Sequence, residues 1–167
     1  MPTVAIVPAA GKAERFGGGK LLAEVDGEPL LNRTLRSLLD GGVERAVVVL
    51  APGATLATVD LLNDPRVRRV INPNPERGML SSIQIGLAAE DGDLFLVLPG
   101  DMPFVKAATV RLVVAETQRK SRIVSPRIDG RNGHLVAFPA RFKDAILQAD
   151  VAPTLADVLD THRNERT

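Results

Sequence analysis

The sequence has 167 residues, which suits one domain over residues 1–167, and its net charge of +1 excludes a strong basic field that would attract nucleic acid polymers. The absence of cysteine excludes disulfides, thiolate metal sites and a cysteine nucleophile, while the absence of tryptophan and tyrosine leaves little material for stacking bases. The apolar N-terminal stretch is interrupted by Pro8 and Gly11 and has no basic region before it. We therefore expect neither a signal peptide nor a membrane span, and a cytoplasmic protein.

Apolar runs alternate with helical patterns along the chain. Strands are predicted over residues 3–8, 45–51, 67–71 and 93–98, with shorter candidates at 123–125 and 135–138. Helices are predicted over residues 29–39, 54–62, 79–89 and 105–119, the first because leucines recur at helical spacing after a proline and before two glycines. This alternation predicts an α/β fold, a single three-layer α/β/α domain with a mostly parallel, Rossmann-like sheet.

The segment AAGKAERFGGGKLL, residues 9–22, follows the first predicted strand. It is not a Walker A loop, because Glu14 stands at the first glycine position and Leu21 replaces the magnesium-binding hydroxyl. It is not a dinucleotide fingerprint, because Leu22 occupies the third glycine position. Exposed backbone N–H groups together with Lys12, Arg15 and Lys20 suit a polyphosphate. A solvated loop has the same composition, so the segment alone leaves both interpretations open.

Three later segments combine turn residues with polar side chains. LVLPGDMPF, residues 96–104, ends a predicted strand, so Asp101 projects from the carboxyl end of the sheet. A carboxylate there suits either Mg²⁺ that is bound together with substrate phosphates, or an Asx-type turn with nearby backbone N–H groups. NPNPERGMLSSIQIGL, residues 72–87, puts Ser81 and Ser82 at the start of a helix, as capping residues or as contacts to a polar ligand. GRNGH, residues 130–134, offers Arg131 and His134, and with only two histidines in the chain a multi-histidine metal site is excluded.

In this order, the segments resemble the nucleotidyltransferase superfamily of molybdenum cofactor cytidylyltransferases and their guanylyltransferase relatives. The matching stretches are AAGKAERFGGGKLL, GEPLL, NPNPERGMLSSIQIGL, LPGDMPFV, GRNGHLVAF and TLADVLDTH. The resemblance implies an α/β fold of the nucleotide-diphospho-sugar transferase type and a Mg²⁺-dependent enzyme. Such an enzyme transfers a nucleoside monophosphate from a nucleoside triphosphate to a phosphorylated small molecule such as molybdopterin, and releases pyrophosphate.

The resemblance also implies roles for individual residues. Backbone contacts to the nucleotide come from Ala9, Ala10 and Gly11, and phosphate charge is offset by Lys12, Arg15 and Lys20. Asp101 matches the aspartate that binds the catalytic Mg²⁺. The neighbourhood of the base is formed by Asn72, Gly78, Ser81 and Ser82, and the substrate-side loop contains Arg131 and His134. The Ala-Ala-Gly opening resembles the cytidylyltransferase branch, so CTP is the expected nucleotide.

Two features depart from the family pattern. Relatives have Gly-His-Pro-Val in the substrate-side loop, whereas here His134 is followed by Leu135. Relatives continue to a final strand and an Asp-x-Asp-Thr-Pro motif that completes the metal site, and we expect this domain to lack both. The apolar spacing of Leu155, Val158 and Leu159 predicts a helix in this region instead.

Other interpretations stay open at this point. The string VPAAG also resembles the isoprenoid-pathway cytidylyltransferases that act on methylerythritol phosphate. A sugar-phosphate cytidylyltransferase is a further alternative, and so is a catalytically silent relative that binds a nucleotide or a cofactor.

Overall fold

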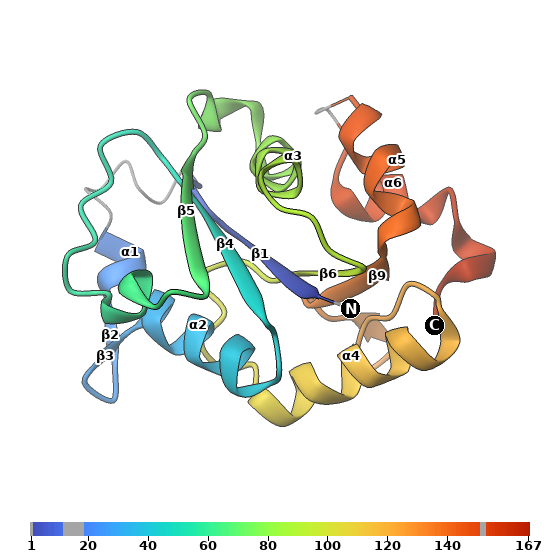
Figure 1. Ribbon diagram of the computed structural model, residues 1–167, viewed down its shortest axis with the longest axis horizontal. Helices are drawn as coiled ribbons and strands as arrows, with labels where there is room; N and C mark the ends of the chain where they lie inside the picture. Colours follow the sequence, from blue (N-terminus) through green and yellow to red (C-terminus); the bar gives the residue numbers. More distant parts are fainter. Residues whose placement is uncertain (1, 12–18, 151–152) are drawn as a thin grey trace.

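A five-stranded sheet forms the centre of the computed structural model, which describes residues 2–11, 19–150 and 153–167 (Figure 1). Its strands are β1 (Thr3–Ala9), β4 (Arg45–Leu50), β5 (Val67–Ile71), β6 (Leu94–Val97) and β9 (Val136–Pro139), in the order β5-β4-β1-β6-β9. All pairs are parallel except β6 with β9 at the sheet edge. Central β1 is buried along its whole length, which explains its continuous apolar sequence. The predicted mostly parallel sheet is confirmed.

Helices cover both faces of this sheet, as the sequence predicts (Figure 1). On one face, α2 (Leu30–Asp40) and α4 (Ala107–Lys120) bury leucine and valine side chains in one apolar cluster. On the other face, α3 (Met79–Ala89), α5 (Lys143–Gln148) and α6 (Leu155–Asp160) pack around a second cluster. The helix α6 confirms the helical pattern near the C-terminal end.

Short elements fill the connections between the layers. They are α1 (Gly19–Leu22), the hairpin of β2 (Glu24–Val25) and β3 (Glu28–Pro29), and the hairpin of β7 (Arg127–Ile128) and β8 (Arg131–Asn132). Single 3₁₀ turns occur at η2 (Asp60–Asn63), η3 (Pro75–Arg77), η4 (Ala140–Phe142) and η5 (Arg163–Glu165).

Two predicted elements are wrong. Residues 54–62 form turns and the 3₁₀ turn η2 instead of a helix. The buried side chains there, Leu56, Val59 and Leu62, recur every three residues, which suits a 3₁₀ repeat better than the 3.6-residue α-helical repeat. Residues 123–125 make only isolated bridges, Ile123 with Arg166 and Val124 with Ala137, because consecutive residues pair with different neighbours.

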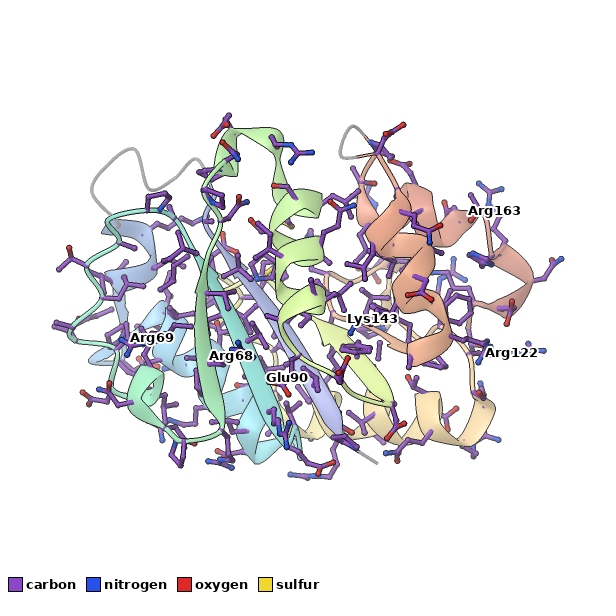
Figure 2. The ribbon with its side chains drawn as sticks, turned by 45° about the horizontal axis from the view of Figure 1, so that its top comes forward. Arg68, Arg69, Glu90, Arg122, Lys143 and Arg163 are labelled. Atoms are coloured by element: carbon purple, nitrogen blue, oxygen red, sulfur yellow. The ribbon has the colours of Figure 1, made fainter. Side chains whose placement is uncertain are left out.

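Ion pairs form at the N-terminal ends of β4 and β5, which is the end of the sheet opposite the carboxyl ends of the parallel strands. Arg45 of β4 and Arg68 of β5 approach the carboxylate of Glu90 at the end of α3, at 2.6 Å and 3.8 Å. Figure 2 shows Arg68, Glu90 and Lys143 in this region, and Lys143 of α5 donates to the Glu90 carbonyl at 3.1 Å. The C-terminal end of α3 is therefore fixed against both the sheet and α5.

The strand order creates a switch point beside β1. The chain passes from β1 to β4 and β5 on one side, and then crosses to β6 on the other side. In open α/β sheets, ligands bind at the carboxyl ends of the strands at such a point. The residues that follow β1 and β6 are therefore the first place to look for a site.

Gly86 allows α3 to lie against β1. A Cβ atom at this position would stand 2.5 Å from Ile6 Cγ2 and 3.1 Å from Val49 Cγ2. We predict that Gly86→Ala lowers the free energy of unfolding by about 1–3 kcal/mol through overpacking, although alanine normally favours a helix. Urea denaturation measures this, with exposed Ala88→Gly as the propensity control. A Gly86→Ala protein as stable as the parent would contradict the close packing.

Candidate functional site

The carboxyl ends of β1 and β6 open onto a first cavity of about 280 Å³. Its lining includes Ala9, Ala10, Gly11, Lys20, Ser82 and Asp101. Ala9 and Ala10 are almost completely buried, while Gly11 is exposed. The turn that follows β1 therefore presents mainly small residues and backbone to whatever occupies the cavity.

A tight turn after β6 positions Asp101. The Gly100 N–H donates to the carbonyl of Pro8 at 3.0 Å, and the buried Thr34 hydroxyl donates to the Gly100 carbonyl at 2.9 Å. A Cβ on Gly100 would stand 3.0 Å from Leu31 Cδ1 and 3.3 Å from Ala9 Cβ. Glycine therefore lets this turn pack closely against the end of β1, and the turn carries Asp101 to the rim of the cavity.

Lys20 and Asp101 form an ion pair at this rim. Lys20 Nζ donates to Asp101 Oδ2 at 2.7 Å, and the two side chains are 56% and 34% exposed. Buried Leu21 anchors the short helix α1, so that its neighbour Lys20 faces the cavity. Exposed ion pairs of this kind contribute only about 0–1 kcal/mol. A ligand phosphate can therefore replace Asp101 as the partner of Lys20, and a cation can replace Lys20 as the partner of Asp101, at little energetic cost.

A buried polar network holds the start of α3. The Asn74 N–H donates to Asn72 Oδ1 at 2.9 Å, which fixes the orientation of the Asn72 amide because a backbone N–H can only donate. Asn72 Nδ2 then donates to Ser81 Oγ at 3.0 Å and to Ser82 Oγ at 2.9 Å. Ser81 Oγ donates to the Gly78 carbonyl at 2.7 Å. Asn72 and Ser81 thus have their hydrogen-bonding groups occupied within the protein.

Ser82 differs from its neighbour in this network. Its hydroxyl accepts from Asn72, and among the described residues it has no acceptor for its own proton. Ser82 lines the first cavity, whereas Asn72 and Ser81 do not appear in that lining. The geometry therefore leaves one hydroxyl proton that can be donated to a ligand.

A second cavity of about 670 Å³ adjoins the first. The two share Gly78, Met79 and Pro99. Gly78 is the N-cap of α3, and its φ of 96° lies in the left-handed region that favours glycine. Because Gly78 and Met79 line both cavities, the start of α3 lies between the two spaces. His134 lines the second cavity, together with Arg77 and Arg166.

The structure brings together only part of the predicted site. Lys20, Ser82, Gly78 and Asp101 meet at the first cavity with the Ala9–Gly11 turn, and His134 lies at the second. Arg131 lies on the exposed strand β8, outside the lining of both cavities. Lys12 and Arg15 lie outside the described residues. Within residues 2–11, 19–150 and 153–167, no group of three or more His, Asp or Glu side chains is placed to hold a metal.

Sequence reasoning did not identify Arg77, Met79, Pro99, Thr154 and Arg166 as lining residues. Arg77 and Met79 flank Gly78, so proximity in the sequence could have pointed to them. Thr154 and Arg166 reach the second cavity only through tertiary packing. The Thr154 N–H and hydroxyl both donate to Asp157, at 2.8 Å and 2.7 Å, and these bonds lower the pKa of that carboxyl.

Comparison with known proteins decides the family. Residues 5–166 match the MobA-like NTP transferase domain. The chain belongs to this family. The fold of this MobA-like chain can therefore be compared with that of its relatives.

The curated relatives of the MobA-like chain include several nucleotidyltransferases. The 2-C-methyl-D-erythritol 4-phosphate cytidylyltransferase of Saccharopolyspora erythraea is 35% identical over 135 residues, which cover 75% of this chain and 59% of that protein. A probable molybdenum cofactor guanylyltransferase of Thermococcus sibiricus is 26% identical over 146 residues, which cover 87% of this chain and 71% of that protein. The chain thus spans about three fifths of the first relative.

Solved structures show the same fold. Rv0371c from Mycobacterium tuberculosis superposes with a TM-score of 0.82 at 21% identity, covering 99% of this chain and 86% of that one. The 4-diphosphocytidyl-2C-methyl-D-erythritol synthase of Anaerococcus prevotii gives a TM-score of 0.74 at 18% identity, covering 97% and 82%. The fold of the MobA-like chain is that of the nucleotide-diphospho-sugar transferases. Among its described helices, none has the length and apolar character needed to cross a membrane.

Removing the Asn72 amide would leave buried hydrogen-bonding groups without partners. We predict that Asn72→Ala lowers the free energy of unfolding by about 1–3 kcal/mol. The matched control is Asn74→Ala, which keeps the backbone N–H at an exposed position and should change stability by less than about 0.5 kcal/mol. Urea denaturation of both variants checks this, and equal stabilities would show that the network contributes nothing.

Proposed function

We propose that the chain is a nucleotidyltransferase that moves a nucleoside monophosphate, CMP by preference, from Mg-NTP to a phosphate monoester such as molybdopterin. Pyrophosphate is the second product. The observation that carries this proposal is the pair of adjoining cavities at the carboxyl edge of the sheet, joined at Gly78, Met79 and Pro99. Group transfer between two small molecules needs two sites that meet at the reacting atoms.

The first cavity is the proposed nucleotide site. The turn from Ala9 to Gly11 would approach the nucleotide through its backbone, and Lys20 would offset phosphate charge. Lys12 and Arg15 keep the phosphate-contacting roles that the family resemblance implies. Ser82 would donate its unused proton to the nucleotide, while Asn72 and Ser81 would act by holding Ser82 and the Gly78 turn.

Asp101 suits a divalent cation that arrives with the nucleotide. Mg²⁺ in such sites is held by one or two carboxylates together with substrate phosphates, not by a cage of protein ligands. One half-exposed carboxylate at the rim of the first cavity fits this arrangement. Bound Mg²⁺ would supply charge neutralisation at the phosphate oxygens. The proposal of a divalent cation is supported by the structural neighbour Rv0371c, which has also been solved as a complex with manganese.

The chain's own residues would then position and neutralise the reactants. Near neutral pH a phosphate monoester is already anionic, so one of its oxygens can attack the α-phosphorus of the NTP without a protein general base. The new oxygen–phosphorus bond forms as the bond to the β-phosphate oxygen breaks, and pyrophosphate leaves. Lys20 would exchange its weak pairing with Asp101 for the charge that develops on the departing pyrophosphate.

The choice of CTP rests on the Ala-Ala-Gly opening and on the cytidylyltransferases among the relatives. The 3-deoxy-manno-octulosonate cytidylyltransferase of Chlorobium phaeobacteroides, for example, is 35% identical over 124 residues. A probable guanylyltransferase is also a relative, so GTP is the natural competitor in any assay. A protein that binds CTP but releases no pyrophosphate with any acceptor would be a silent relative.

Lys20 and Asp101 are predicted to have separable effects. Lys20→Ala should weaken NTP binding by about tenfold or more, because a charge-assisted contact to phosphate is lost. Asp101→Ala should lower pyrophosphate release with molybdopterin by at least about a hundredfold. Calorimetry and a pyrophosphate assay measure these effects. Lys120→Ala is the charge-matched control on α4, because Lys120 lines neither cavity. Unchanged affinity and turnover in both site variants would remove this assignment.

The metal is predicted to bind together with the nucleotide. Mn²⁺, a spectroscopic substitute for Mg²⁺, should bind the protein weakly alone and at least about tenfold more tightly with CTP, because phosphates complete its coordination. Electron paramagnetic resonance titration of free Mn²⁺ with the protein, with and without CTP, checks this. Because CTP itself binds Mn²⁺, CTP without protein is the necessary blank. Tight Mn²⁺ binding by the nucleotide-free protein would contradict the prediction.

A further inference from the structure

Sulfur chemistry in this chain is confined to methionine. Cysteine is absent, and the three methionines are Met1, Met79 and Met102. A peroxide that reaches the protein therefore meets no thiol, and the thioether sulfurs are the groups that it can oxidise most readily. Met1 lies outside the described residues, so Met79 and Met102 are the two methionines whose surroundings the structure describes.

The side chains of Met79 and Met102 differ in their access to solvent. Met79, the first residue of α3, is 55% exposed, although the next residue, Leu80, is almost completely buried. Neither apolar cluster formed by the described residues includes Met79, whereas the partly buried Met102 packs against the first cluster. Susceptibility to oxidation increases with exposure, so Met79 is the more reactive of the two.

Met79 also occupies the junction of the two cavities. Together with Gly78 and Pro99 it lines both spaces, while Met102 lines neither. Leu21 adds further apolar surface to the first cavity. A methionine side chain is unbranched and flexible, so it can pack against a ligand that reaches the junction. A change of polarity at this one side chain therefore affects both cavities.

We propose that Met79 is a site of reversible oxidation, at which a peroxide forms the sulfoxide and thereby weakens ligand binding where the two cavities meet. The inference rests on the proposed function for the identity of the ligand, Mg-CTP. The site takes its place from the fold, because the same residue is the exposed start of α3 and a shared wall of both cavities.

The oxidation transfers one oxygen atom to sulfur. A lone pair of the thioether attacks one oxygen of hydrogen peroxide, and the O–O bond breaks as the S–O bond forms. The other oxygen leaves as hydroxide and takes the proton of the transferred oxygen, so that the products are the sulfoxide and water. Sulfur loses two electrons, and the peroxide gains them. Methionine sulfoxide reductases reverse the change with electrons from a thiol.

The sulfoxide changes what the junction offers to a ligand. Its S–O group is polar and accepts hydrogen bonds, but it has no proton to donate. Phosphate oxygens are acceptors too, so they cannot pair with it, and it can compete for the protons of Lys20 and Ser82 in the lining of the first cavity. Covering a polar group without giving it a hydrogen bond costs free energy. Oxidation of Met79 should therefore lower the affinity for the nucleotide without disturbing the core.

Treatment of the full chain with hydrogen peroxide tests the order of oxidation. Peptide mass spectrometry should show that Met79 is oxidised at least about fivefold faster than Met102, because its side chain is more exposed. Saturating Mg-CTP should slow the oxidation of Met79 and leave that of Met102 unchanged, since Met102 lines neither cavity. Equal rates for the two residues, or no protection of Met79 by Mg-CTP, would overturn the proposal.

Isothermal titration calorimetry measures the effect on binding. Complete oxidation of Met79 should weaken Mg-CTP binding by about tenfold, and methionine sulfoxide reductases with dithiothreitol should restore it. Met79→Gln, which places a permanent polar group at the junction, should weaken binding without any peroxide. The thermal unfolding midpoint should not change on oxidation, because Met79 lies outside both apolar clusters. Unchanged affinity after oxidation would overturn the proposal.

Met79→Leu and Met102→Leu form a matched pair of control variants, since both exchanges nearly conserve apolar volume. The affinity of Met79→Leu for Mg-CTP, whatever its starting value, should not respond to peroxide. Met102→Leu should lose affinity on oxidation as the parent does. A peroxide-dependent loss that persists in Met79→Leu would overturn the assignment to Met79.

Pyrophosphate release separates this inference from the proposed function. Mg-CTP binding that falls on oxidation of Met79, in a protein that releases no pyrophosphate with any acceptor, would support the inference and count against the transferase. Equal rates of pyrophosphate release and equal Mg-CTP affinities before and after complete oxidation would support the transferase and overturn the inference.

Discussion

The site depends on the close approach of β1 and β6 at their carboxyl ends. The Gly100 N–H bonds directly to the Pro8 carbonyl, and the missing side chain at Gly100 lets Ala9 and Leu31 pack against the turn. Because of this contact, Asp101 lies beside the backbone turn that follows β1. Lys20, in the four-residue helix α1, donates to the Asp101 carboxylate at the cavity rim. A wider gap between the strands would separate the acidic group from the small-residue turn.

Much of the fold could be predicted because the central strands β1, β4 and β6 are buried along almost all their length and read as apolar runs. The helix predicted over 54–62 was wrong because its buried residues follow a three-residue repeat. The Leu61 N–H also donates to Asn32 Oδ1 of α2, at 2.9 Å. The first cavity was foreseeable, since its residues follow two strands that a parallel sheet brings together. The second cavity was not foreseeable, because α6 lines it through tertiary packing that no local sequence pattern indicates.

Hydrogen-bond direction separates residues that look alike in the sequence. Asn72, Ser81 and Ser82 were all candidates for contact with a ligand, and all three are buried. The Asn74 N–H fixes the orientation of the Asn72 amide, so that Ser81 accepts from Asn72 and donates to Gly78. Ser82 also accepts from Asn72, but its own proton has no acceptor among the described residues. The side chain of Asn72 is thus part of the support for the site. A residue type alone could not have distinguished support from contact.

Gln84 of α3 donates from Nε2 to the carbonyls of Ile146 and Ala149 at the end of α5, at 2.9 Å and 2.8 Å, and these bonds have a consequence for molecular recognition. They connect a helix that begins between the cavities to the helix layer beyond the second one. The cost in conformational entropy of shaping that space is met when the chain folds, before any small molecule arrives. A pre-shaped site loses little freedom on association, so even a compact ligand with few contacts can be retained.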